Sequence, residues 1–283
     1  MSAHGALAAQ VESGYVADGP VARPSSSSTR LARGRVARTL RDHLLVVAAL
    51  VSVWHAAAAV TDDYWLPSPR VTFSRVAGDL VSASVVEHAA VTLAEGVAGL
   101  AAGTAPAVGL ALLLRRRVLA TSVLEPFMMA GYGLPKVILT PLFILWFGVG
   151  LGPKIAVVAL SAFFVVYVNT LAGLRGIDVR LVKTARVLGA TPREVVLRIV
   201  LPSAMPFVMT GVRTAVPYSI GGAVLAELLS ANRGLGYLLQ FNATSFDTAG
   251  VFSVLVIIGA VVAVLNAVVN AIERRWIRPH AAR

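Results

Sequence analysis

Long apolar blocks alternate with polar segments along this chain. Six blocks cover about residues 44–60, 91–114, 127–147, 155–174, 206–228 and 251–272. Each block is close to the ~20 residues that a helix needs to cross the hydrocarbon of a bilayer. The pattern therefore predicts an all-α membrane protein whose single domain, residues 41–283, contains six transmembrane helices.

The first 40 residues do not follow this pattern. They are rich in polar residues, glycine and proline, and they end in a basic stretch that includes Arg30, Arg35 and Arg38. Segments with too little apolar surface to form a core remain disordered, so we expect a disordered, basic cytoplasmic tail over residues 1–40. A secretory signal peptide also places basic residues before an apolar run. The tail is longer and the following run more extended than that alternative requires.

The distribution of charge predicts the orientation. The net charge is +11, only 14% of residues are charged, and mean hydropathy is +0.77. Most of the 25 Lys and Arg residues lie in the tail, at 115–117, in the 175–198 loop or near the C-terminus; the opposite loops hold Arg70, Arg75, Lys154 and Arg233. By the positive-inside rule, both termini are expected in the cytoplasm of a bacterial cell. Short basic runs between apolar blocks also argue against nucleic-acid binding.

The 175–205 segment is polar but strongly patterned. Apolar residues recur every three to four positions at Ile177, Leu181, Ala185 and Leu188, which predicts one apolar face of a helix. Gly189 follows, and glycine adopts the positive φ that commonly ends a helix. We therefore expect a helix that ends in a glycine turn.

A second helix is expected directly after this turn. Thr191 and Glu194 have the spacing of a capping box, and Pro192 occupies the first helical position between them. Pro202 is expected to end this helix. The helix–turn–helix unit would serve either as a docking element for a protein partner or as an interfacial pair on the membrane surface, and amphipathicity alone does not separate the two.

The same segment resembles the signature loop of ABC importer permeases. That signature is Glu-Ala-Ala, three residues, Gly, nine residues, Ile, one residue and Leu-Pro; Ala185, Gly189, Ile199 and Pro202 fit it without a gap. Lys183 and Thr184 depart from its first two positions. Further blocks are similar to the nitrate, sulfonate and taurine subgroup: Trp65–Pro69, Pro141–Gly150, Asn169–Gly173, Ala226–Leu228 and Gly234–Gly236.

The resemblance implies a type I importer permease bundle with a cytoplasmic coupling helix. It implies a second permease copy, a cytoplasmic ATPase dimer that binds the ATP and Mg, and an extracytoplasmic solute-binding protein that delivers a small anion such as a sulfonate, taurine or nitrate. No cofactor is expected on this chain, and no Walker A loop is present in it. The residues expected to dock on the ATPase are Ala185, Gly189, Ala190, Thr191, Pro192, Glu194, Ile199 and Pro202.

Three polar residues in the apolar blocks are candidates for the solute path. Glu227 is an acidic group at membrane depth, where charge is costly and often functional. Asn169 and Tyr218 carry hydrogen-bonding groups, although bonding between helices is the commoner use of such groups in membranes. Gly99 and Gly103 form a Gly-x-x-x-Gly pair that predicts close helix packing. The short apolar segment 234–239 would be either a re-entrant helix or a helix resting on the outer surface.

Two other classes of protein are less consistent with the sequence. An intramembrane enzyme needs a nucleophile with a base, or clustered metal ligands, but the five histidines are scattered and cysteine is absent. We therefore expect no catalytic and no metal site. A gradient-driven secondary transporter is the main alternative, and it would usually show inverted repeats and ionisable groups at mid-membrane.

Overall fold

The computed structural model describes residues 27–230 and 232–277, and the described chain divides into two units at Ala56. The first unit contains helix α2 (Ser27–Ala59), which ends just beyond that boundary. The sequence predicts disorder as far as residue 40, but residues 27–40 already belong to α2. Its Ala, Leu and Arg residues favour the helix. The remainder of the expected tail, residues 1–26, lies outside the described residues.

The second unit is built from helices throughout its described part. They are α3 (Pro69–Leu80), α4 (Ala83–Leu114), α5 (Val118–Gly133), α6 (Thr140–Phe147), α7 (Leu151–Arg175), α8 (Val179–Val187), α9 (Pro192–Val195), α10 (Leu201–Ser230), α11 (Leu235–Thr244) and α12 (Thr248–Ile277). Across both units, five helices are long and apolar enough to cross a membrane, and a bent pair provides a sixth. This confirms the predicted all-α class, with five to six candidate spans among the described residues.

The bent pair is the third predicted span. Its arms, Leu119–Gly133 and Lys136–Phe147, meet at 88°. Leu134, between them, is extended with ψ 135° because it precedes Pro135, whose ring disfavours a helical conformation at the residue before it. The third apolar block is therefore a broken element, as its glycines and prolines suggest, rather than a straight helix.

Helix α3 lies between the first two apolar blocks, where the sequence predicts a loop that contains Arg70 and Arg75. Ser68 caps it by accepting a hydrogen bond from the Val71 N–H, and Pro69 occupies its first turn. Its basic residue Arg75 pairs with Asp79 at 3.3 Å and with Asp247 at 3.1 Å. The contact with Asp247, the hydrogen bond from the Ser253 hydroxyl to Asp79, and the packing of Val76 against the apolar side chains of α12 hold α3 on α12.

Pro202 does not end a helix, contrary to the sequence prediction. A π-helical turn, η2 (Val196–Val200), joins α9 to α10, so that Pro192–Leu229 forms one helix of 38 residues. In this turn the Leu201 N–H bonds to the Val196 carbonyl, five residues earlier. Proline has no N–H and its ring clashes with the carbonyl four residues before it. The wider turn directly before Pro202 reduces that conflict.

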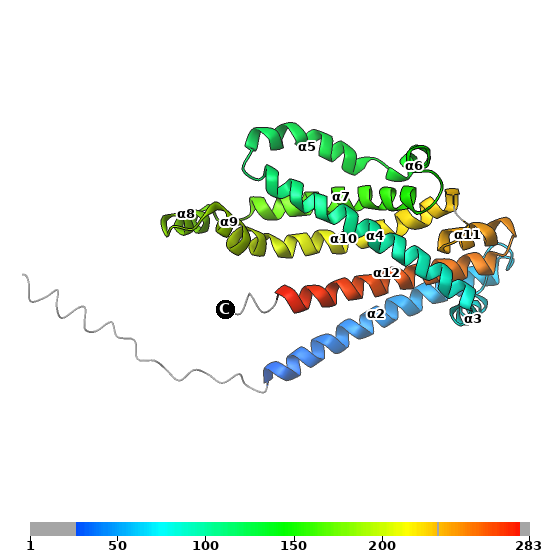
Figure 1. The fold of residues 1–283 in the computed structure, drawn as a ribbon. Coiled ribbons are helices and arrows are strands. Elements are labelled where there is room, and N and C mark those ends of the chain that lie inside the picture. Colours follow the sequence, from blue (N-terminus) through cyan, green and yellow to red (C-terminus); the bar gives the residue numbers. More distant parts are fainter. Residues whose placement is uncertain (1–26, 231, 278–283) are drawn as a thin grey trace, which may run out of the picture. The chain divides into compact units, whose positions relative to one another are not determined.

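Helices α4, α7 and α10 form the centre of the second unit. They run side by side in Figure 1, with α8 and α9 at one end and α11 at the other. Their shared core includes Ala107, Val166 and Val216, and side chains of α12 extend it. Small residues allow the close contact, since a Cβ at Gly99 would overlap Val158 and one at Gly103 would overlap the Ala159 carbonyl oxygen. The predicted Gly-x-x-x-Gly packing is confirmed.

This contact can be tested by a matched pair of substitutions in α4. Gly103→Ala should lower the free energy of unfolding by about 1–3 kcal/mol, because the added methyl group overpacks the α4–α7 contact. Gly109→Ala, where the methyl group would meet no atom within 4 Å, should be neutral or slightly stabilising. Thermal unfolding of both variants in detergent measures the difference. Equal stabilities would contradict glycine-mediated packing.

Candidate functional site

The turn after α8 is a complete glycine C-cap. Gly189 has φ +86°, in the left-handed region that favours glycine. Its N–H bonds to the Arg186 carbonyl at 3.0 Å, and the Ala190 N–H bonds to the Ala185 carbonyl at 2.9 Å. These two bonds make a Schellman motif. The predicted end of the first helix is thus confirmed, and the backbone of Ala185 and Ala190 is fixed by the turn.

The helix that follows begins with the predicted capping box. The Glu194 N–H bonds to the Thr191 hydroxyl at 3.3 Å, and the Thr191 N–H bonds to the Glu194 carboxylate at 3.0 Å. Pro192 occupies the first turn, where its missing N–H costs nothing. Val195 and Val200 are buried and fasten this end to the bundle. Both ends of the turn are therefore held by local hydrogen bonds.

Several apolar side chains at the end of α8 are uncovered within the described chain. Leu188 is 81% exposed, Leu181 and Val187 are also exposed, and α8 contains no buried residue. A hollow lies between α8 and the helix that follows. It is lined by five of the eight residues expected to dock, namely Ala185, Gly189, Ala190, Glu194 and Ile199, together with Leu188, Val195 and Arg198. The 175–205 segment is thus held by local hydrogen bonds and yet leaves Leu181, Val187 and Leu188 uncovered.

A buried polar cluster at the opposite end of the bundle surrounds Glu227. The Glu227 carboxylate accepts a bond from the Gly236 N–H at 2.7 Å and from the Thr92 hydroxyl at 2.8 Å. The Thr92 oxygen accepts from the Leu235 N–H at 2.8 Å, and His88 Nδ1 accepts from the Gly234 N–H at 2.9 Å. We call this set the α11 anchor. It satisfies three successive backbone donors at the start of α11, where a helix has no internal acceptors for them.

Two glycines make the α11 anchor possible. Gly234 has φ +110°, and a Cβ there would overlap the Glu227 carboxyl group. A Cβ at Gly236 would lie 2.7 Å from Glu227 Cβ. Their lack of side chains lets the backbone approach the carboxylate directly, which explains the Gly-Leu-Gly sequence at this position.

A buried ion pair lies close to the α11 anchor. Lys154 Nζ, in the first turn of α7, is 2.7 Å from Glu95 Oε1 in α4, and both side chains are almost fully buried. Glu95 lies three residues after Thr92, about one turn along α4. The sequence places Lys154 in an outer loop. The structure corrects this, because Lys154 turns inward to neutralise Glu95.

The structure does not bring the three candidate path residues together. Glu227 is enclosed by α4 and α11. Asn169 donates to the Val165 carbonyl of its own helix at 2.8 Å, and its Cβ would lie 3.0 Å from a Cβ on Gly211 at the α7–α10 contact. Tyr218 is 53% exposed on α10. Within residues 27–230 and 232–277, no group of three His, Asp or Glu side chains is arranged to hold a metal ion.

Residues 99–278 match the family model described as "binding-protein-dependent transport system inner membrane component". The chain belongs to this family of ABC importer permeases. This family assignment excludes the alternative class, a gradient-driven secondary transporter. It also identifies the chain as a multi-pass membrane protein.

Individual relatives cover most of this permease. It is 35% identical to the formylaminopyrimidine transport permease ThiX of Halalkalibacterium halodurans, over 72% of this chain and 82% of the relative. It is 28% identical to a putative aliphatic sulfonates transport permease, SsuC of Bacillus subtilis, over 93% and 96% of the two chains.

Solved structures show the same fold at lower identity. A chain of the MetNI methionine ABC transporter aligns with TM-score 0.57 and 22% identity, covering 68% of this permease and 94% of that chain. A chain of a bacterial alginate ABC transporter aligns with TM-score 0.57 and 15% identity, covering 84% and 96%. Both confirm the type I importer permease fold.

The α11 anchor predicts a specific response to substitution of Glu227. Glu227→Ala should lower the free energy of unfolding by about 1–3 kcal/mol, because it leaves the Gly236 N–H buried without an acceptor. Glu227→Gln should recover part of this loss, since its amide oxygen can still accept. Because the chain has no cysteine, a single Leu238→Cys marker would report release of α11 by faster labelling with a water-soluble thiol reagent.

The control for Glu227 is Glu87→Ala. Among the described residues, Glu87 forms a solvent-exposed pair with Arg233 at 3.4 Å, and such pairs contribute about 0–1 kcal/mol. Labelling of the marker that is as slow in Glu227→Ala as in Glu87→Ala would show that Glu227 does not hold α11.

The buried ion pair gives a second prediction. Lys154→Met should lower the free energy of unfolding by about 3–5 kcal/mol, because it leaves the Glu95 charge buried and unpaired. Adding Glu95→Leu should restore most of that stability, since an apolar pair of similar volume replaces the ion pair. The test is thermal unfolding of both single variants and the double variant in detergent. Additive losses in the double variant would refute the pairing.

Proposed function

We propose that this permease carries a small organic or inorganic anion into the cytoplasm, driven by a separate ATPase that docks on the 175–205 segment. The single observation that carries this proposal is that the 175–205 segment is ordered and yet partly uncovered. It is capped at both sides of Gly189, and its side chains Leu181, Val187 and Leu188 remain uncovered. A surface that is already ordered loses little conformational entropy on binding, which favours association with a protein partner.

The proposed assembly follows the composition of the family. Two copies of the permease would enclose the solute path, an ATPase dimer would bind ATP and Mg, and a solute-binding protein would deliver the solute from outside. This chain would hydrolyse nothing and hold no cofactor. The hollow beside Gly189 is the proposed seat of ATPase contacts, and five expected docking residues line it.

The proposed orientation places the 175–205 segment and both termini in the cytoplasm of a bacterial inner membrane. The arginine triplet at 115–117 and the basic residues of the 175–198 loop lie toward this side. The inward position of Lys154 supports the same orientation, because it leaves fewer free basic residues on the opposite side.

The proposed substrate class is an aliphatic sulfonate or a similar small anion. Support comes from the sulfonate permeases of Bacillus subtilis and of Escherichia coli, to which this chain is 28% and 32% identical. Relatives named for formylaminopyrimidine and riboflavin transport share comparable similarity. Of the three candidate path residues, Tyr218 has the exposure that contact with solute requires, whereas Glu227 and Asn169 contact protein in this conformation.

The docking proposal can be tested with two equally exposed apolar residues. Leu188→Asp should reduce ATP hydrolysis stimulated by the loaded binding protein about tenfold or more, because it places a charge in the proposed ATPase contact. The measurement uses proteoliposomes containing the permease with the ATPase and the binding protein encoded beside it.

The substrate class is tested in the same system with the parent permease. Parallel assays with a sulfonate, formylaminopyrimidine or riboflavin on the binding protein distinguish the substrate classes.

Val81→Asp is the control, since Val81 is 85% exposed at the end of α3 and far from the 175–205 segment in the chain. It should leave the stimulation unchanged. Stimulation that survives Leu188→Asp would mean that the apolar face of α8 meets lipid rather than the ATPase.

A further inference from the structure

Three arginines converge on one hollow at the end of α4. Arg115 and Arg116 follow the last turn of α4, and Arg186 reaches the same hollow from α8. Its wall is aliphatic, formed by side chains such as Leu174 and Val182, and its volume is about 230 Å³. The hollow therefore combines a cationic rim with an apolar wall.

The charges of these arginines are not neutralised within the described chain. None of the ion pairs of residues 27–230 and 232–277 involves Arg115, Arg116 or Arg186. Partial burial, followed by the positive charges of Arg116 and Arg186, lowers the pKa of Arg115. Concentrated positive charge without a carboxylate partner favours binding of an anion.

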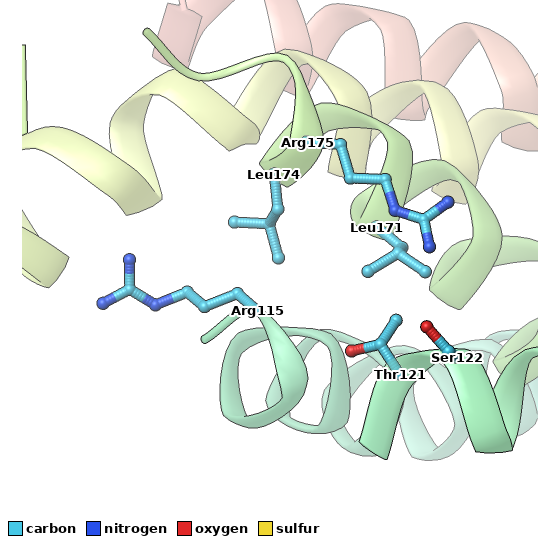
Figure 2. A pocket seen from close by; sticks show the side chains of 6 residues that line it. All are labelled: Arg115, Thr121, Ser122, Leu171, Leu174 and Arg175. Carbon is cyan, nitrogen blue, oxygen red and sulfur yellow. The ribbon is translucent and has the colours of Figure 1, made fainter. Parts of the chain in front are cut away.

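A neighbouring hollow shows the opposite arrangement. It is lined by Arg115, Thr121, Ser122, Leu171, Leu174 and Arg175 (Figure 2). The Arg175 guanidinium is neutralised by both oxygens of Glu125, at 3.2 and 2.9 Å, and the Thr121 hydroxyl lies 3.0 Å from the Leu114 carbonyl oxygen. The Arg115 guanidinium points away from Thr121 and Ser122 in Figure 2. Its charge is therefore available to the hollow that it shares with Arg116 and Arg186.

The position of the hollow lined by Arg115, Arg116 and Arg186 indicates which kind of anion could bind there. Arg115 directly follows the apolar helix Ala83–Leu114, and Leu174 is in the last turn of the apolar helix Leu151–Arg175. Basic residues at the end of membrane-spanning helices lie at the depth of lipid headgroups. A guanidinium rim can bind phosphate oxygens bidentately, while an aliphatic wall accepts the upper part of an acyl chain.

We propose that the hollow of Arg115, Arg116 and Arg186 binds the phosphate of an anionic phospholipid of the cytoplasmic leaflet. The proposal rests on the orientation given under the proposed function. Basic pockets between transmembrane helices on the cytoplasmic side bind anionic lipid headgroups. Because Arg186 belongs to α8, the bound lipid would also contact the 175–205 segment.

The test measures lipid binding directly. The full-length permease, alone and in complex with its ATPase, is titrated in neutral detergent with phosphatidylglycerol, phosphatidylcholine or inorganic phosphate. Bound lipids are counted by native mass spectrometry. Arg115→Gln and Arg186→Gln should each weaken phosphatidylglycerol binding about fivefold, the effect of one basic residue near an anionic lipid. Arg274→Gln removes an exposed arginine near the end of α12 and should have no effect.

The proposal is overturned if the Arg115 and Arg186 variants retain phosphatidylglycerol like the parent, or if Arg274→Gln weakens binding equally. Equal binding of phosphatidylcholine, or of inorganic phosphate without any preference for phosphatidylglycerol, would also overturn it. Loss of ATPase association with lipid binding unchanged would assign the arginines to the ATPase interface instead. Since lipid binding is measured without nucleotide or solute, failure of the importer function would leave this result intact.

Discussion

A carboxylate buried at membrane depth must be satisfied by the protein itself, because hydrocarbon offers it no hydrogen bonds. At Glu227 this requirement determines how one end of the α4–α7–α10 core is closed. The carboxylate binds the first turn of α11 together with Thr92, and two glycines let the backbone reach it. The start of α11 depends on this arrangement, because its first backbone donors bond to Glu227, Thr92 and His88.

Local features of this permease could be predicted from its sequence. The apolar blocks give the spanning helices, and the spacing of Thr191, Pro192 and Glu194 gives the capping box. The positive φ of Gly189 was expected from its position between two helical patterns. Each of these features depends on residues within a few positions of one another, where backbone geometry and hydrogen bonding follow from the sequence directly.

Features that depend on distant residues could not be predicted in the same way. Glu95 and Lys154 are 59 positions apart, and Thr92 and Glu227 are 135 apart. Glu95, Thr92 and Glu227 are polar residues in apolar blocks, which indicates that each has a partner, but the sequence does not say which pairs form, and Lys154 lies just outside a block. Pro202 is a case in which a local prediction was wrong, because the helix that it was expected to end continues through it. The usual rule for proline failed there because a π-helical turn accommodates it.

The π-helical turn also has a mechanical consequence. Because it keeps α9 and α10 continuous, one helix of 38 residues begins at the capping box and ends two residues after Glu227. Such a helix is about 57 Å long. If this helix moved as a rigid rod, a tilt of about 5° at one end would displace the other by about 5 Å, which is close to one helical turn. A displacement of the glycine turn would then be transmitted to α11 through the helix backbone, without a series of side-chain rearrangements.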